Sequence, residues 1–531
     1  MTNWFKTGAL LAALTACPAA VSAEVPIPRL SPMNGVMVAS LGAADIPAAE
    51  PLTPAEAIAR EAKVDVSIAV ADFYEARNFA PVWTPEKAAE LRAYLAAAAG
   101  EGLDPADYFV PLDGAGGLSA AAVDVSLTET ALRYAHDAYS GRIDPQTVSR
   151  IVSMEPPKLD EARFLRLLAQ TRNLTGLMDQ LSPEHPQFVA LRDKLRAALA
   201  TGGEGSMPVG AGPALKRGSS EVRVALLRRR LGATVRRGED PQTFDAGLEE
   251  AVRAYQRSRG LSADGIVGPR TLSHLDAGIV GDPTDALISN MERWRWMPRK
   301  LGRHNVTVNI PAYRVRVNTD GETVYDGKVI VGAVGHKTPV FADEIEHIVV
   351  NPYWNVPVSI ASNEMLGGIQ ANPGGYFARK GYEAVVGGRV VNPNSLSWHR
   401  GMLHKVRIRQ KPGRGNALGA VKFLFPNKYA VYLHDTPSKS LFGRDVRALS
   451  HGCVRVDQPF EFAEALLSQT DALSGKGISR MVGGKQRWLN LDAKIPVYLS
   501  YFTMEVDAGG TLRRYSDVYG FDARTQRALG L

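Results

Sequence analysis

The sequence predicts a multidomain α+β protein with an all-α N-terminal region and a mainly β C-terminal domain. Its 531 residues exceed what one hydrophobic core usually holds, so we expect roughly two to four domains. Up to about residue 200 the chain is rich in Ala and Leu, and Phe164, Leu167 and Leu168 have helical spacing. After about residue 300 the period becomes alternating, as at Val306 and Val308, which is typical of β-strands.

Local signals divide the chain further. Thr53 and Thr84 are each followed by Pro and predict helix starts. Residues 202–213 are rich in Gly and Pro and predict a linker, after which three short helices form a small domain. Residues 358–425 are rich in Gly, Pro and Asn with few periodic runs. Because so long a loop inside a compact domain is usually functional, we interpret it as an inserted capping subdomain.

The N-terminus is typical of an export signal. Lys6 is followed by a short apolar run and by small residues that end at Ala23. Residues 14–17 also resemble a lipoprotein box, in which Cys17 would be acylated, but Pro18 is an unfavourable neighbour and we favour cleavage after Ala23. No other stretch approaches 18 apolar residues, so we expect no transmembrane segment in the mature protein.

Composition and net charge restrict the classes of partner that the protein is expected to bind. Hydrophobic residues make up 45% and charged residues 22%, as in soluble globular proteins. The formal net charge of +7 favours anionic partners, among them a bacterial wall polymer. We find no zinc-finger spacing, long basic run or aromatic RNA-binding signature, so we expect no nucleic-acid partner.

The chemistry points to Cys453. The chain has two cysteines, and loss of Cys17 with the signal would leave one thiol in an exported protein. The alternative is a buried, inert cysteine. A thiol needs a base near neutral pH, and His434 follows an alternating strand, so we predict Cys453 as nucleophile and His434 as its proton acceptor and donor. Backbone N–H groups at Gly452 and Cys453 would hold an oxyanion, and the Asp435 carbonyl would orient the imidazole.

These residues carry a family resemblance. His434, fifteen intervening residues and then Ser450, His451, Gly452 and Cys453 resemble the signature of the L,D-transpeptidase (YkuD-type) catalytic domain. Residues 351–357, 416–419 and 435–442 are similar to the large multidomain Gram-negative members, and residues 254–272 resemble a peptidoglycan-binding module. The family pattern generally has Asn where this chain has Arg455, so the role of that position is in question.

The resemblance implies a β-sandwich and a specific reaction. Cys453 would attack a peptidoglycan tetrapeptide stem between diaminopimelate and D-Ala, and an amine of a second stem would resolve the thioester into a 3→3 cross-link. Carbapenems would acylate the thiol, and the protein would lie in the periplasm, with other cell-wall synthesis proteins as further partners. Two alternatives stay open: water as acceptor, which makes an L,D-carboxypeptidase or endopeptidase, and a non-catalytic wall-binding scaffold.

Other side chains are assigned to substrate contacts or to no specific role. We predict substrate contacts from Ser450, His451, Arg455, Tyr353 and Trp354, although the two aromatic residues are equally suited to packing. No cofactor is expected, and no metal, because the thiols and histidines lack ligand spacing. Three further histidines are expected to be ordinary: His336, His347 and His404.

The predicted organisation is a signal peptide (1–23), a flexible leader (24–52), a helical scaffold domain (53–201), a peptidoglycan-binding-like module (214–277), a linking helix (282–300), a catalytic domain (304–500) and a C-terminal segment (501–531).

Overall fold

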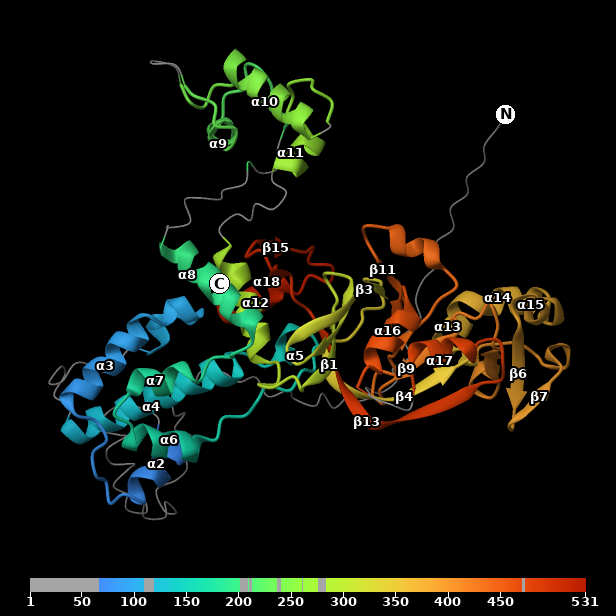
Figure 1. The fold of residues 1–531 in the computed structure, drawn as a ribbon, viewed down its shortest axis with the longest axis horizontal. Helices are drawn as coiled ribbons and strands as arrows, with labels where there is room; N and C mark the ends of the chain where they lie inside the picture. Colours follow the sequence, from blue (N-terminus) through green and yellow to red (C-terminus); the bar gives the residue numbers. More distant parts are fainter. Residues whose placement is uncertain are drawn as a thin grey trace, which may run out of the picture. The chain divides into compact units, whose positions relative to one another are not determined.

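A computed structural model describes residues 66–108, 119–200, 209, 213–235, 240–259, 261–275, 283–469 and 473–531 (Figure 1). The predicted signal peptide, the leader, Cys17 and the helix start at Thr53 lie outside these residues. In the described part of the chain, no helix combines the length and apolar character that a membrane crossing requires.

The N-terminal region is helical, as the sequence predicts. Thr84 caps its helix by accepting the backbone N–H of Lys87. Buried residues of the longest helix share one core with four of the other helices, and in this core the carboxylate of Asp124 accepts the Tyr74 hydroxyl and two backbone N–H groups. The helices are α2 (Ile68–Glu75), α3 (Pro85–Ala96), α4 (Ala120–Ser140), α5 (Pro145–Val148), α6 (Glu161–Gln170), α7 (Leu174–Asp179) and α8 (Pro186–Ala200).

The small domain also has the three helices that the sequence predicts. They are α9 (Val222–Arg230), α10 (Ala246–Ser258) and α11 (Pro269–Leu275). Leu248 and Val252 are fully buried on one face of α10, and Gln256 accepts the N–H of Gly265 and donates to the Asp264 carboxylate. A small apolar core and this buried amide stabilise the module.

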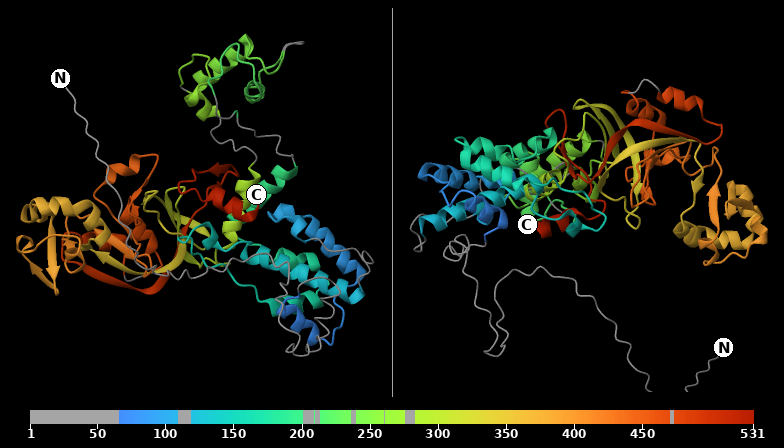
Figure 2. Two further views of the ribbon diagram at one scale, coloured as in Figure 1. Left: turned by 180° about the vertical axis from the view of Figure 1, so that it is seen from behind. Right: turned by 90° about the horizontal axis from the view of Figure 1, so that it is seen from below.

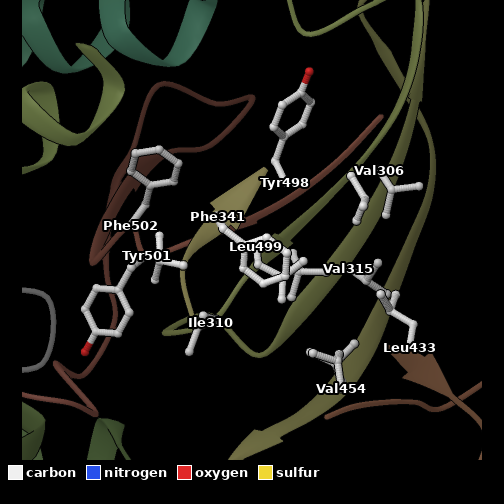
Figure 3. Close-up of a cluster of buried hydrophobic side chains, with 14 of the residues drawn as sticks. Val306, Ile310, Val315, Phe341, Leu433, Val454, Tyr498, Leu499, Tyr501 and Phe502 are labelled. Atoms are coloured by element: carbon white, nitrogen blue, oxygen red, sulfur yellow. The ribbon is translucent and has the colours of Figure 1, made fainter. Parts of the chain in front are cut away.

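The C-terminal domain is built on a nine-stranded sheet in the order β11-β3-β12-β10-β9-β4-β13-β1-β2. Because β2 also pairs with β3, the strands close into a ring around a buried apolar core (Figure 3). The strands are β1 (His304–Asn309), β2 (Arg314–Thr319), β3 (Glu322–Gly332), β4 (Phe341–Val350), β9 (Val421–Leu424), β10 (Leu433–His434), β11 (Ala448–Ser450), β12 (Val454–Val456) and β13 (Arg487–Ser500). Two helices, α16 (Pro459–Leu466) and α17 (Gly475–Arg480), add buried side chains to this core.

The predicted insertion is a folded unit with its own core, and we call residues 354–411 the cap subdomain. Its sheet has the order β5-β8-β6-β7, and Figure 2 shows it from two sides. Its last predicted residues differ from expectation, since β9 belongs to the main sheet. The elements are too short for a visible period: β5 (Trp354–Asn355), α13 (Val358–Ile360), a π-helical turn (Ala361–Met365), α14 (Leu366–Ala371), α15 (Pro373–Lys380), β6 (Tyr382–Val386), β7 (Arg389–Val391) and β8 (Arg407–Gln410).

The predicted linking helix is α12 (Thr284–Arg295), and nine of its twelve residues are buried. Its Glu292 carboxylate accepts the backbone N–H groups of Arg142 and Ile143, and its Arg293 pairs with Asp522 at 2.7 Å. Asp522 lies in α18 (Asp522–Leu529), which follows the hairpin of β14 (Met504–Val506) and β15 (Leu512–Arg514). Therefore α12 is a packed element that contacts the helical region and the C-terminal segment, rather than an exposed connector.

Candidate active site

Two neighbouring strands carry the predicted catalytic pair. Strands β10 and β12 run parallel, with Leu433 opposite Val454 and His434 opposite Arg455. Leu433 and Val454 are fully buried in the core. Because side chains alternate along a strand, His434 and Arg455 lie on the opposite face of the sheet. The N–H of Val454 donates to the carbonyl of Tyr432, so the pairing continues toward Cys453.

Cys453 is a free, half-buried thiol. Burial raises the pKa of this thiol above its ordinary range, although hydrogen bonds to Tyr432 and the positive charges of Arg455 and Lys422 act in the opposite direction. The net effect is a raised pKa for the Cys453 thiol. The resting group at neutral pH is therefore the thiol, and a base must remove its proton before it can act as a nucleophile.

His434 is suited to be that base. Its side chain is buried, and its Nδ1 lies 2.5 Å from the carbonyl oxygen of Asp435, which is the contact that the sequence predicts. A carbonyl can only accept, so Nδ1 carries the proton and Nε2 keeps its lone pair. Burial, and then the charge of Arg455, lower the pKa of His434 to about 4, against the opposing effect of the Asp435 carbonyl. The imidazole is therefore neutral at pH 7 and able to accept a proton.

Asp435 is held in place from several sides. Its carboxylate accepts the N–H of Ala420 at 2.8 Å and pairs with Lys439 at 2.8 Å, while its own N–H donates to the Val421 carbonyl. Gly419 has a φ of +64°, and a Cβ at this position would lie 2.3 Å from the Asp435 carboxylate. A glycine is therefore required beside the residue that orients His434.

The turn before the nucleophile uses its own polar groups. The Ser450 hydroxyl donates to the Cys453 carbonyl at 2.6 Å and accepts the Gly452 N–H at 3.1 Å. Thr338 donates to the Gly452 carbonyl at 2.8 Å, and Gly452 has a φ of +112°. Two expectations change as a result. The Gly452 N–H is engaged within the turn instead of facing an oxyanion, and the buried Ser450 hydroxyl shapes the loop instead of contacting substrate.

The backbone N–H of Cys453 is left as the candidate oxyanion donor, since it has no acceptor among the described residues. A donor with no internal partner next to the reacting sulfur can face the carbonyl oxygen of a bound substrate. The predicted oxyanion region thus narrows from two backbone N–H groups to that of Cys453.

Two cations flank the imidazole. His434 pairs with Lys422 across the antiparallel β9–β10 ladder and with Arg455 across the parallel β10–β12 ladder, so the three side chains share one face. The Lys422 ammonium lies 5.5 Å from the Tyr432 ring centroid and 5.6 Å from that of Trp488. No carboxylate lies within 4.0 Å of either cation in the parts of the chain that are described.

Lys422 is the functional candidate that sequence reasoning missed. Its position beside His434 follows from strand register, which composition and local pattern do not reveal. The same register answers the question about Arg455: it lies next to the imidazole, where it lowers the pKa of His434 and favours a thiolate at Cys453.

His451 joins the catalytic loop to the cap subdomain. Its exposed Nε2 lies 2.6 Å from the Glu364 carboxylate, in the π-helical turn of the cap. The ring centroid of His336 lies 4.8 Å from that of His451. His336, to which the sequence assigns no role, therefore lies next to a residue of the candidate site.

Tyr353 and Trp354 lie where the chain enters the cap subdomain. The guanidinium of Arg409 lies 4.4 Å from the Tyr353 ring centroid, and Trp354 packs against the core of the cap. Among the described residues, the rings of Tyr353 and Trp354 contact Arg409 and Tyr382, which favours the packing role. Within the described residues, no group of three or more His, Cys, Asp or Glu side chains is arranged to hold a metal ion.

Strand register brings the segment that carries Cys453 next to the segment that carries His434, since Val454 pairs with Leu433. A free thiol, a buried neutral imidazole on the adjacent strand and an open backbone N–H at the cysteine are the groups that nucleophilic thiol chemistry needs. Family comparisons identify the domains. Residues 303–478 match the L,D-transpeptidase catalytic domain, residues 68–195 match a "Scaffold domain", and residues 223–275 match a "Putative peptidoglycan binding domain". Three successive segments of the chain are therefore similar to a scaffold domain, a peptidoglycan-binding domain and an L,D-transpeptidase catalytic domain.

One curated protein and several solved structures are similar to parts of this chain. A "Putative L,D-transpeptidase" of Haemophilus influenzae is 34% identical over 248 residues, which is 46% of this chain and 50% of that protein. The chain thus matches about half the length of this curated relative. An L,D-transpeptidase structure from Xylanimonas cellulosilytica is 17% identical and covers 55% of this chain and 98% of its own, with a TM-score of 0.16. One from Mycobacterium smegmatis is 13% identical and covers 37% and 58%, with a TM-score of 0.19.

Proposed function

We propose that this protein is an L,D-transpeptidase that forms 3→3 peptidoglycan cross-links through a thioester on Cys453. The observation that supports the proposal is the parallel pairing of β10 and β12, which brings the Cys453 segment next to a neutral, buried imidazole whose Nδ1 proton is held by the Asp435 carbonyl. The matched catalytic and peptidoglycan-binding domains support the choice of substrate.

In the proposed first half-reaction, Nε2 of His434 accepts the proton of the thiol as Sγ of Cys453 attacks the carbonyl carbon between diaminopimelate and D-Ala. The carbonyl oxygen becomes an oxyanion, which the Cys453 N–H stabilises, with Lys422 and Arg455 adding positive charge on the same face. The C–N bond then breaks, the imidazolium returns its proton to the leaving amine of D-Ala, and the thioester remains.

In the second half-reaction, the side-chain amine of a second stem attacks the thioester carbonyl. His434 accepts a proton from this amine, the C–S bond breaks, and the sulfur takes the proton back as the free thiol. His434 therefore alternates between base and acid in both halves, which requires an imidazole that is neutral at rest.

The test is to incubate the protein with disaccharide-tetrapeptide and to identify the products by mass spectrometry, with Cys453→Ala as control. We expect a 3→3 dimer and free D-Ala. Tripeptide without dimer would show that water is the acceptor. No turnover would favour the alternative that the protein is a non-catalytic wall-binding scaffold. Intact mass after exposure to a carbapenem should show one adduct, which the Cys453→Ala chain lacks.

We also propose that residues 1–23 export the chain to the periplasm, where its substrate lies, and that the helical scaffold domain contacts other cell-wall synthesis proteins. Support comes from the peptidoglycan-binding and scaffold matches. Cell fractionation should find the chain in the periplasm, and deletion of residues 1–23 should keep it in the cytoplasm. Labelling with palmitate would instead reveal acylation of Cys17.

A further inference from the structure

The cap subdomain is strongly basic. Residues 354–411 contain eight Lys and Arg residues but two acidic residues, in a chain whose formal net charge is +7. Both acidic side chains are already paired. Glu364 contacts His451 at 2.6 Å, and Glu383 pairs with Arg409 at 2.8 Å and with Lys411 at 3.3 Å. The excess positive charge of the cap is therefore available to an anionic ligand.

A cavity of about 450 Å³ lies in this subdomain, within the usual size range of ligand sites. Its lining mixes buried aliphatic side chains with three exposed basic ones and with a glycine hairpin. We call it the cap groove, and its main residues are Val356, Leu403 and Ile408, then His404, Lys405 and Arg407, and finally Gly387 and Gly388. Among the described residues, no carboxylate lies within 4.0 Å of its three basic side chains.

The lining has the chemistry of a site for a short anionic peptide. Arg407 lies directly opposite Val385 across β6 and β8, so a guanidinium and an aliphatic side chain face the same side of the sheet. Gly387 and Gly388 both have positive φ and open space at the Cβ position, so another backbone can approach them closely. Carboxylates would pair with the basic side chains, while small methyl groups would contact the aliphatic ones.

The groove is also linked to the catalytic loop. Ala361 lines the groove, and Glu364 belongs to the same π-helical turn, three residues further along the chain. Glu364 contacts His451, which is two residues before Cys453. A peptide held in the groove is therefore attached to the part of the cap that contacts the nucleophile's own turn.

We infer that the cap groove binds the acceptor peptide stem through its carboxylates. This inference rests on the proposed transpeptidase function. The acceptor is a short peptide with free carboxylates and small side chains, which is the ligand that the groove fits. Holding it by its anionic end leaves the side-chain amine free to reach the thioester.

The test compares two double variants of the full chain: Lys405→Ala with Arg407→Ala in the groove, and Arg379→Ala with Lys380→Ala as the matched control. The control residues are exposed, belong to the same subdomain and do not line the cavity. In a Cys453→Ala background, disaccharide-tripeptide is titrated into each protein by calorimetry. We expect the affinity to fall about tenfold for the groove variant and to change less than twofold for the control. The difference in affinity between the groove variant and the protein with an intact groove should become smaller as the salt concentration is raised.

A product ratio provides the second readout. Proteins that retain Cys453 receive disaccharide-tetrapeptide together with a free D-amino acid, so that a large and a small acceptor compete for one thioester. The ratio of dimer to exchange product should fall about tenfold in the groove variant. Unchanged affinity and ratio would overturn the inference, as would an equal loss of both products, which would indicate a donor defect. If the parent chain makes neither product, the proposed function fails, while the titration still decides whether the groove binds a stem.

Discussion

Replacing Ser450 with Ala tests whether its hydroxyl builds the turn or contacts substrate. The hydroxyl is buried, donates to the Cys453 carbonyl at 2.6 Å and accepts the Gly452 N–H at 3.1 Å. The substitution leaves both backbone groups without their partner. Each orphaned group costs about 1–3 kcal/mol, and water can reach the half-buried Cys453, so we expect a loss of about 2–4 kcal/mol. For a domain of this size, Tm should fall by roughly 10 °C.

The loss should also reach the chemistry, because this turn holds the sulfur and the Cys453 N–H. We expect carbapenem acylation, followed by intact mass, to slow by about 10- to 100-fold. Ser440→Ala is the matched control, since Ser440 is exposed and its hydroxyl has no partner among the described residues. If Ser450→Ala behaves like this control, the turn argument is wrong. A normal Tm with a raised KM would instead restore the substrate-binding role.

Three further predictions follow from the site and its surroundings. Gly419→Ala should lower the free energy of unfolding by about 2–4 kcal/mol in urea titrations, because its Cβ would lie 2.3 Å from the Asp435 carboxylate; a change below about 0.5 kcal/mol would contradict the contact. Burial raises the pKa of Cys453, so its alkylation by iodoacetamide should accelerate at a more alkaline pH than the alkylation of free cysteine. Arg455→Met should move this pH still higher, because the substitution removes a positive charge that lowers the pKa of Cys453. Rapid alkylation at pH 7 would refute both expectations. Burial lowers the pKa of His185 to about 4, so stability should fall as pH drops from about 6.5 to 4, by up to about 1.4 kcal/mol per pH unit; His185→Gln should flatten this slope, and an identical slope would exclude His185 as its source.

The direction of that last effect follows from proton binding. Between about pH 4 and 6.5 the folded state keeps the His185 imidazole neutral, while the unfolded chain protonates it. Because the unfolded state binds more protons in this range, acid favours unfolding. The ring of His185 stacks on that of Trp294 in α12, with the ring centroids 4.0 Å apart. Protonation of His185 would therefore destabilise the packing of the helical region on α12.

Periodicity predicts the elements of this chain that are long enough to show it. Leu248 and Val252 of α10 and the alternating residues of β1 are buried as their spacing indicates. The cap subdomain lacked such a signal because its strands are two to five residues long. The burial of α12 was also missed, since its Glu292 and Arg293 look like solvent-facing charges until their partners in distant segments are known.

For the site, the sequence predicts candidate reacting groups more readily than their surroundings. A thiol and a histidine with the right neighbours can be recognised along the chain, and their strands prove to be adjacent. Which backbone N–H is open cannot be read in this way, because it depends on where the Ser450 hydroxyl points. The position of Lys422 depends on register across β9 and β10, and a slip of one residue would put it on the other face.

The two pKa directions at the site restrict how the reaction can begin. A raised pKa at Cys453 and a lowered pKa at His434 both disfavour a resting thiolate–imidazolium pair. In the proposed reaction both groups are therefore neutral at rest, and charge separates only when the thiol attacks the substrate. Lys422 and Arg455 then have a specific consequence: they oppose the imidazolium but stabilise negative charge on sulfur and oxygen, so their net effect is favourable when the oxyanion has formed. A resting thiol also resists oxidation, because the thiolate is the form that oxidants attack. The same arrangement that delays activation until substrate is present therefore protects the single thiol of the described chain.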